Sequence, residues 1–128
     1  MMKLKSMDAH FQCRLETDNK IIVDTSQKNG GTGLCLQPFE LMEAAVAACM
    51  NITVRARAER AGITINNVQT AVQMNWSEEG KLIFEYDYSI MGDFNSEAQN
   101  LLTDAINGCM LRQLLTHRKI EFKKVETK

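Results

Sequence analysis

The sequence has few residues that break secondary structure, and it has almost no net charge. It contains one proline and seven glycines in 128 residues, and its 15 basic and 16 acidic residues leave a formal net charge of -1. This balance provides no overall attraction to nucleic acid or to an anionic membrane surface, so we expect neither as a partner. No apolar run approaches the roughly 18 residues of a membrane span, and no signal-peptide pattern follows the first lysines, so we expect a cytoplasmic protein.

The four cysteines lack the short paired spacings of structural metal sites. Cys13, Cys35, Cys49 and Cys109 are separated by 22, 14 and 60 positions. These separations match neither a C-x-x-C motif nor the ligand spacing of zinc-binding domains, so we expect no bound metal and no cofactor. Structural disulfides are disfavoured in a reducing compartment. The thiols therefore serve either packing or chemistry.

The pattern of apolar residues predicts one α+β domain over residues 1–128. The chain length and the 45% apolar content suit a single hydrophobic core. The predicted order is ββαββααβ, with antiparallel sheets around one long central helix. The predicted elements are strands at 9–16 and 21–26, a helix at 38–61, strands at 63–77 and 82–90, helices at 96–106 and 109–117, and a last strand at 119–126.

The central helix is the dominant feature of this prediction. Pro38 suits a first helical turn, and Gly62 suits a C-terminal cap, with Arg57 and Arg60 in the last turns. The middle of the helix, AAVAACM, is apolar on every side, whereas its end, RARAER, is amphipathic. A helix buried on all faces in so small a domain needs more cover than one sheet provides, so we expect a homodimer.

Two cysteines lie on predicted helices in different electrostatic settings. Cys49 is too far from the start of its helix for the helix dipole to acidify it, whereas Cys109 opens a short helix whose free N–H groups favour a thiolate. Electrostatics therefore predicts Cys109 as the more acidic thiol. Buried cysteine commonly packs as a small hydrophobe, so the residues alone leave packing and chemistry open for both. Cys13 and Cys35 have no evident acid–base partner, and we expect them to be structural.

The stretch GGTGLCLQPFELMEAAVAAC, residues 30–49, and the later stretch DAINGCMLRQLL, residues 104–115, resemble the OsmC/Ohr family of cysteine-based organic hydroperoxide reductases. The shared features are a glycine-rich loop, a P-x-E-L segment, a helix of small residues that carries a cysteine, and a second cysteine that opens a late helix. The resemblance implies an intertwined homodimer with the long helices at its centre and active sites at the interface.

The resemblance also implies a reaction for the two helix cysteines. The Cys49 thiolate attacks an organic hydroperoxide, releases an alcohol and becomes a sulfenic acid. Cys109 condenses with this sulfenic acid to give a Cys49–Cys109 disulfide and water, and a dithiol or lipoylated reductant restores both thiols.

The family holds its first cysteine as a thiolate with an N-terminal arginine and a glutamate near the helix start, which implies Arg14 and Glu40 here. Positions nine apart differ by about 180° on a straight helix, so Glu40 and Cys49 share a site only if two chains build it. Alternative groups are Glu43 for the carboxylate and Arg55 and Arg112 for the cation.

The sequence departs from the family pattern in two places. The Gly-Gly-Arg motif of the organic-hydroperoxide branch is absent, and Met110 follows Cys109 where the family has proline. A non-enzymatic OsmC-like binding or redox-sensing module with an apolar interface pocket is therefore the alternative function. A dimeric structural scaffold is the third.

Overall fold

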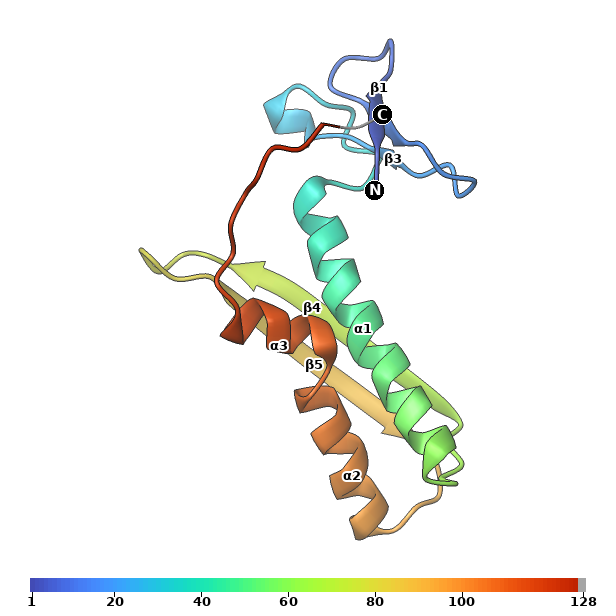
Figure 1. Cartoon of the computed structure of the whole chain (residues 1–128). Coiled ribbons are helices and arrows are strands. Elements are labelled where there is room, and N and C mark those ends of the chain that lie inside the picture. The colour runs from blue at the N-terminus through green and yellow to red at the C-terminus, as the bar shows by residue number, and fades with distance from the viewer. Residues whose placement is uncertain (127–128) are drawn as a thin grey trace. The chain divides into compact units, whose positions relative to one another are not determined.

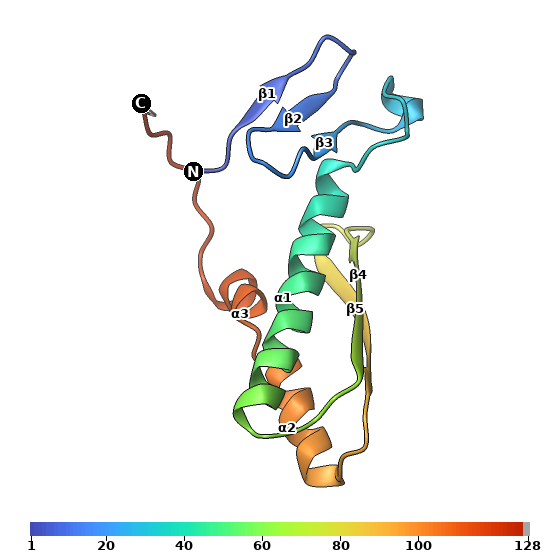
Figure 2. The same cartoon turned by 90° about the vertical axis from the view of Figure 1, so that its right-hand side faces the viewer.

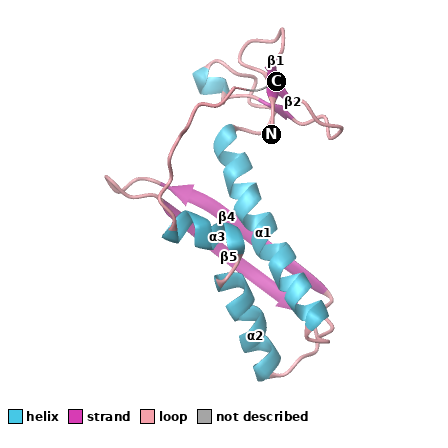
Figure 3. Cartoon of the chain, viewed as in Figure 1, coloured by secondary structure: helices cyan, strands magenta, loops and turns pink. Residues whose placement is uncertain are grey.

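The computed structural model describes residues 1–126 as an α+β chain built around one long helix, which confirms the predicted fold class (Figure 1, Figure 2). The elements are β1 (Leu4–Ser6), β2 (Cys13–Leu15), β3 (Ile22–Val23), the 3₁₀ helix η1 (Gln27–Asn29), α1 (Pro38–Arg60), β4 (Asn67–Asn75), β5 (Ile83–Met91), α2 (Ser96–Asn107) and α3 (Met110–His117). Strands β1, β2 and β3 form one sheet in that order, and β4 pairs with β5 in a second (Figure 3).

The chain divides into two compact units. The first unit consists of residues 1–45 and 73–85, and the second consists of residues 46–72 and the chain from residue 86. Because α1, β4 and β5 each contribute residues to both units, the division does not fall at a linker. A single domain over residues 1–128 stays a prediction.

The first unit contains the small antiparallel sheet. Cys13 of β2 lies opposite Ser6 of β1 and opposite Val23 of β3. Strands β2 and β3 fall inside the predicted hairpin, whereas β1 has only three residues, all exposed, and therefore has no alternating pattern by which to predict it. Val23 is 3% exposed and forms a parallel bridge with Leu36, so the sheet holds the loop that leads to α1.

The carboxylate of Asp24 organises the loop between β3 and α1. It is 2% exposed and accepts hydrogen bonds from the backbone N–H of Thr25 (2.7 Å), the N–H of Thr32 (3.0 Å), the Thr32 hydroxyl (2.8 Å) and the Gln12 amide (3.4 Å). The Thr32 N–H makes the largest contribution in lowering the pKa of Asp24, and burial opposes this effect. The loop is therefore folded around one buried charge.

Gly31 is required by the close approach of this carboxylate. A Cβ atom at this position would lie 2.6 Å from Oδ1 of Asp24 and closer still to the carbonyl oxygen of Thr25. Any larger residue would have to displace backbone atoms. The second glycine of the NGG sequence thus serves loop packing.

Local signals set both ends of α1. Pro38 is the first helical residue, and the Glu40 side chain accepts a hydrogen bond from the Gln37 N–H at 3.0 Å, as the glutamate of a capping box does. At the other end Gly62 has φ of 68°, and the Ile63 N–H donates to the Ala58 carbonyl at 2.8 Å in a Schellman arrangement. The predicted helix at 38–61 and its glycine cap are confirmed.

The core of the second unit forms where α1 meets α2. Four buried residues repeat at every fourth position of α1: Val46, Met50, Val54 and Ala58. Leu102, Ala105 and Ile106 are the buried residues of α2, and in this unit both helices lie on the same face of the strands (Figure 2). Full burial of each large apolar side chain contributes about 1.5–3 kcal/mol, so the buried residues of both helices stabilise the unit.

One chain does not bury α1 on every side. Ala48 is exposed, and the exposed fraction of Ile52 is 57%. The all-round burial expected for AAVAACM is therefore absent from the single chain. Ala45, Ala48 and Ile52 are exposed and lie on one side of α1, which leaves an apolar face on the middle of the helix.

The last predicted element differs from the structure. Residues 119–126 form neither a helix nor a strand in the described chain, and Ile120 and Phe122 are 62% and 100% exposed. Alternating apolar residues become a strand only when a neighbouring strand accepts their backbone hydrogen bonds. No strand within the described chain does so here.

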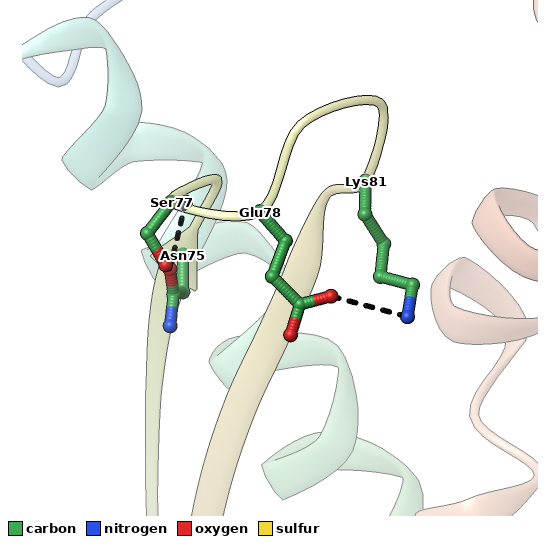
Figure 4. A network of polar contacts seen from close by, with 4 residues as sticks. All are labelled: Asn75, Ser77, Glu78 and Lys81. Carbon is green, nitrogen blue, oxygen red and sulfur yellow. Dashed lines mark hydrogen bonds and ion pairs between the residues drawn. The ribbon is translucent and has the colours of Figure 1, made fainter.

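The turn between β4 and β5 is held by short polar contacts (Figure 4). Oδ1 of Asn75 accepts hydrogen bonds from the Ser77 N–H at 3.0 Å and from its hydroxyl at 2.7 Å, and Lys81 pairs with Glu78 at 3.2 Å. The ion pair is exposed, so its contribution to stability is small. Side-chain hydrogen bonds from Asn75, then from Gln73, lower the pKa of Glu85.

We expect Asp24→Asn to destabilise the first unit near neutral pH, because it removes the charge that the N–H and hydroxyl groups of Thr32 bind. The pKa of Asp24 in the folded chain lies below its ordinary value of 3.8. The stabilisation is therefore complete above that value and is lost as the pH falls through the folded-state pKa. Urea unfolding should show a difference between wild type and variant that narrows in acid, whereas the exposed control Asp18→Asn should unfold like wild type at every pH. If the difference in stability between wild type and Asp24→Asn were as large in acid as at neutral pH, this assignment would be contradicted.

Candidate functional site

The two helix cysteines meet in the second unit. Cys49 lies on α1 and is half-buried, and Cys109 lies at the start of α3 and is 0% exposed. The Cys49 thiol lies near enough to Cys109 to raise the pKa of the Cys109 thiol, and all four cysteines of the chain are free. The structure therefore brings together two reduced thiols that are 60 positions apart in the sequence.

Cys109 is placed by the short junction between α2 and α3. Only Gly108 separates it from the last residue of α2, and its N–H donates to the Ile106 carbonyl at 3.3 Å. Its own carbonyl accepts from the Gln113 N–H at 3.1 Å, within the first turn of α3. The thiol is thus fixed by backbone hydrogen bonds on both sides.

Cys49 is placed by the buried stripe of α1. It follows Val46 by one turn and directly precedes Met50, both of which are buried. Its carbonyl also accepts a hydrogen bond from the Thr53 hydroxyl at 2.7 Å, one turn further along α1. A helix turns by about 100° per residue, which places Cys49 at the edge of the buried stripe.

Burial reverses the electrostatic prediction for Cys109. Loss of solvent raises the pKa of the Cys109 thiol, and the adjacent Cys49 thiol raises it further, while the nearby N–H groups of Arg112 and Leu111 oppose the increase. Helix electrostatics alone predicts Cys109 as the more acidic of the two thiols, and the raised pKa of Cys109 is opposite in direction to the effect behind that prediction. The first turn of α3 does favour a thiolate, but desolvation of a fully buried sulfur outweighs it.

A polar cluster adjoins Cys109 in the same unit. The side-chain oxygen of Asn107 accepts hydrogen bonds from Nη1 of Arg112 at 3.0 Å and from the Tyr86 hydroxyl at 3.4 Å. The guanidinium carbon of Arg112 lies 4.8 Å from the centre of the Tyr86 ring. The one local signal of this cluster in the sequence is the Asn-Gly pair that directly precedes Cys109.

Arg14 and Glu40 lie in the first unit. Arg14 is an exposed residue of β2 opposite Lys5 and Ile22, and neither ion pair among residues 1–126 includes it. Glu40 is exposed and caps the start of α1. Their predicted action on Cys49 stays a prediction.

The alternative groups are engaged elsewhere. The Glu43 carboxylate accepts a hydrogen bond from the Met74 N–H at 2.8 Å. Nε of Arg55 donates to the Asn51 side chain at 2.9 Å on the exposed side of α1. Both interactions are local structural contacts, so neither side chain is free to approach the thiols without breaking one.

Two further features bear on the class of protein. Within residues 1–126, no cluster of three or more His, Cys, Asp or Glu side chains is arranged to hold a metal ion. No helix of this part of the chain has the length and apolar character needed to cross a membrane. The fold and the site together define an α+β domain with a pair of adjacent free thiols.

The chain belongs to the OsmC-like protein family, whose model matches residues 31–124. Among solved structures, an OsmC-like protein from Mycoplasma pneumoniae has a TM-score of 0.69 at 16% identity, with 92% of this chain and 89% of that chain covered. The organic hydroperoxide resistance protein OsmC from Legionella pneumophila has a TM-score of 0.63 at 21% identity, covering 91% and 90%. OhrB, the organic hydroperoxide resistance protein of Bacillus subtilis, has a TM-score of 0.61 at 18% identity, covering 92% of both. No curated protein matches the chain in sequence.

The burial of Cys109 predicts its behaviour toward a thiol reagent. In the native protein, iodoacetamide should alkylate Cys109 at least about tenfold more slowly than in the urea-unfolded chain, because the sulfur is buried and its pKa is raised. Peptide mapping by mass spectrometry after timed quenching measures the rate at each cysteine. The protection of Cys109 should exceed that of half-buried Cys13 and Cys35; equal protection would contradict the buried, high-pKa thiol.

Proposed function

We propose that this chain is a thiol-dependent peroxidase that reduces organic hydroperoxides with Cys49 and Cys109. The observation that carries the proposal is the proximity of the two free thiols in the second unit. Membership of the OsmC-like family and the solved neighbours named for organic hydroperoxide resistance support it. The family relationship supports a peroxidase-like or stress-related role, and the thiol pair supplies the chemistry for it.

The unequal burial of the two thiols assigns their roles. Cys49 is half-buried and is the thiol that a hydroperoxide can approach, whereas Cys109 is fully buried. The Cys49 thiolate attacks one peroxide oxygen, the O–O bond breaks, and the alcohol leaves after protonation, so that sulfur is oxidised to the sulfenic acid. Cys109 then attacks the sulfenic sulfur, a disulfide forms, and the hydroxyl leaves as water with the thiol proton.

Burial of Cys109 suits a resolving thiol. Its apolar neighbours in the core keep it away from the solvent and from peroxide, and its raised pKa keeps it as a thiol until Cys49 is oxidised. Rapid condensation would remove the Cys49 sulfenic acid before a second peroxide oxidises it irreversibly. We infer that an external dithiol or lipoylated reductant returns the disulfide to two thiols.

Arg14 and Glu40 remain our proposed activating pair for Cys49. The resemblance supplies the roles: the cation stabilises the thiolate, and the carboxylate orients the cation. Arg14 is exposed on β2, so nothing in its own sheet neutralises its charge. A cytoplasmic location, where thiols stay reduced, suits this chemistry.

We propose a homodimer as the working form. Ala48 and Ile52 leave an apolar face on α1, and residues 119–126 expose Ile120 and Phe122 with no strand to pair them. In a homodimer, the apolar face of α1 could pack against the same face of a second copy. Residues 119–126 could pair their backbone with a strand of that copy.

A binding module is the second candidate, and one observation favours it. The first unit contains a pocket with a volume of 380 Å³ whose lining is mainly apolar. Such a volume suits a small apolar ligand. The lining residues are Phe11, Cys13, Val23, Asp24, Thr25, Asn29, Gln37, Pro38 and Phe39.

The peroxidase proposal predicts a disulfide. One equivalent of an organic hydroperoxide should lower the mass of the reduced protein by two hydrogens and link the peptides that contain Cys49 and Cys109. Cys49→Ser should abolish peroxide consumption, and Cys109→Ser should leave a sulfenic acid that dimedone traps. The double control Cys13→Ser with Cys35→Ser should retain consumption. Consumption no faster than by a free thiol would refute the enzyme and favour the binding module.

The dimer proposal predicts that one substitution on α1 dissociates the dimer. Ala48→Glu places a charge on the exposed apolar face of α1, where burial against a second copy would require its desolvation. Sedimentation velocity should show a dimer for wild type and a monomer for the variant at micromolar concentration. Asn100→Glu, at an exposed position of α2, is the matched control and should remain dimeric. A wild-type monomer would contradict the proposal.

A further inference from the structure

The last residue of α2 accepts hydrogen bonds from three other side chains, two of them on α3 and one on β5. Asn107, the last residue of α2, accepts on its side-chain oxygen from Arg112 at 3.0 Å and from Tyr86 of β5 at 3.4 Å. Its backbone carbonyl accepts from the Gln113 side chain at 3.0 Å. We name Tyr86, Asn107 and Arg112 the junction clamp.

The junction clamp surrounds the two residues that carry the buried thiol. Gly108 and Cys109 are the whole connection between the helices, and the clamp joins the residue before them to residues in the first turn after them. The Arg112 guanidinium also stacks on the Tyr86 ring at 4.8 Å, which attaches α3 to β5. Three elements thus meet around the backbone of Cys109.

The arrangement argues against Arg112 as the cation that activates Cys49. Its guanidinium already has a hydrogen-bond acceptor in Asn107 and a ring face in Tyr86, and both contacts are fixed in direction. A side chain held in this way orients the helix that bears it. Its effect on the chemistry passes through the position of Cys109.

We propose that Arg112 is a positioning residue that, through the junction clamp, holds the Cys109 sulfur against Cys49 for disulfide formation. This inference rests on the proposed peroxidase function. In that step the Cys109 sulfur bonds to the Cys49 sulfenic sulfur, the S–O bond breaks, and water leaves with the thiol proton. No other reactant enters, so the rate depends on how well the two sulfurs are held in place.

Single-turnover kinetics of Arg112→Met tests the clamp, because methionine keeps much of the side-chain length but has neither charge nor donors. After rapid mixing with cumene hydroperoxide, the rate of Cys49 oxidation should stay within about twofold of that without the Arg112→Met change. Dimedone trapping in a Cys109→Ser background measures this rate. Disulfide formation should slow on the order of tenfold or more, since small displacements of reacting atoms have effects of this size. Arg112→Lys, which keeps the cation and one donor, should restore part of the rate.

Two further variants distinguish a clamp from a general loss of structure. Tyr86→Leu should slow disulfide formation like Arg112→Met, and the double variant should be little slower than either single one, because both remove the same constraint. Arg118→Met, at the other end of α3, is the matched control and should form the disulfide at the wild-type rate. Thermal unfolding should confirm that every variant is folded.

A second readout does not depend on peroxide chemistry. In reduced protein, breaking the clamp should raise the iodoacetamide alkylation rate of Cys109 by about tenfold while that of Cys49 stays unchanged. If wild type forms no disulfide, both the proposed function and the role of the clamp in that reaction are refuted. If Arg112→Met nevertheless exposes Cys109 in that case, the clamp still holds Cys109 in place structurally. If wild type forms the disulfide and Arg112→Met forms it equally fast, or slows Cys49 oxidation equally, the clamp proposal is overturned.

Discussion

The buried stripe of α1 is the constraint on which the candidate site depends. Val46, Met50, Val54 and Ala58 recur at every fourth position and turn one side of α1 toward the core. Cys49 lies between Val46 and Met50, so this stripe sets how deeply its thiol is buried. Ala48 and its neighbours lie on the opposite side of the helix from this stripe. The stripe therefore accounts both for the half-buried thiol and for the apolar face.

The pair of thiols shows how burial and helix electrostatics compete. Cys109 begins α3, where N–H groups favour a thiolate, yet it is 0% exposed and its pKa is raised. Desolvation acts on the whole charge of a buried sulfur, whereas the N–H groups at a helix start contribute partial charges. In the mechanism that we propose, the accessible thiol reacts with the peroxide and the inaccessible thiol then forms the disulfide. The proposed junction clamp follows from the raised pKa of Cys109, because a weakly reactive thiol forms a disulfide quickly only if it is held close to its partner.

The glycine-rich loop has a structural explanation that is separate from the site. Asp24 collects N–H and hydroxyl donors from Thr25 and Thr32, and Gly31 allows the backbone to approach its carboxylate. The loop then delivers the chain to Pro38 in the geometry that Glu40 caps. The glycine-rich loop is thus folded around the protein's own carboxylate.

The sequence alone determined the features that local chemistry controls. Pro38 and Gly62 predict the ends of α1 because a first-turn proline and a left-handed glycine act within a few residues, and alternation predicts β4 and β5. Only the tertiary structure decided the rest. It placed Cys49 beside Cys109 across 60 positions, raised the pKa of Cys109, gathered Tyr86 and Asn107 around Arg112, and left residues 119–126 unpaired. Contacts between distant residues, desolvation and strand pairing depend on which surfaces meet, and no local pattern contains that information.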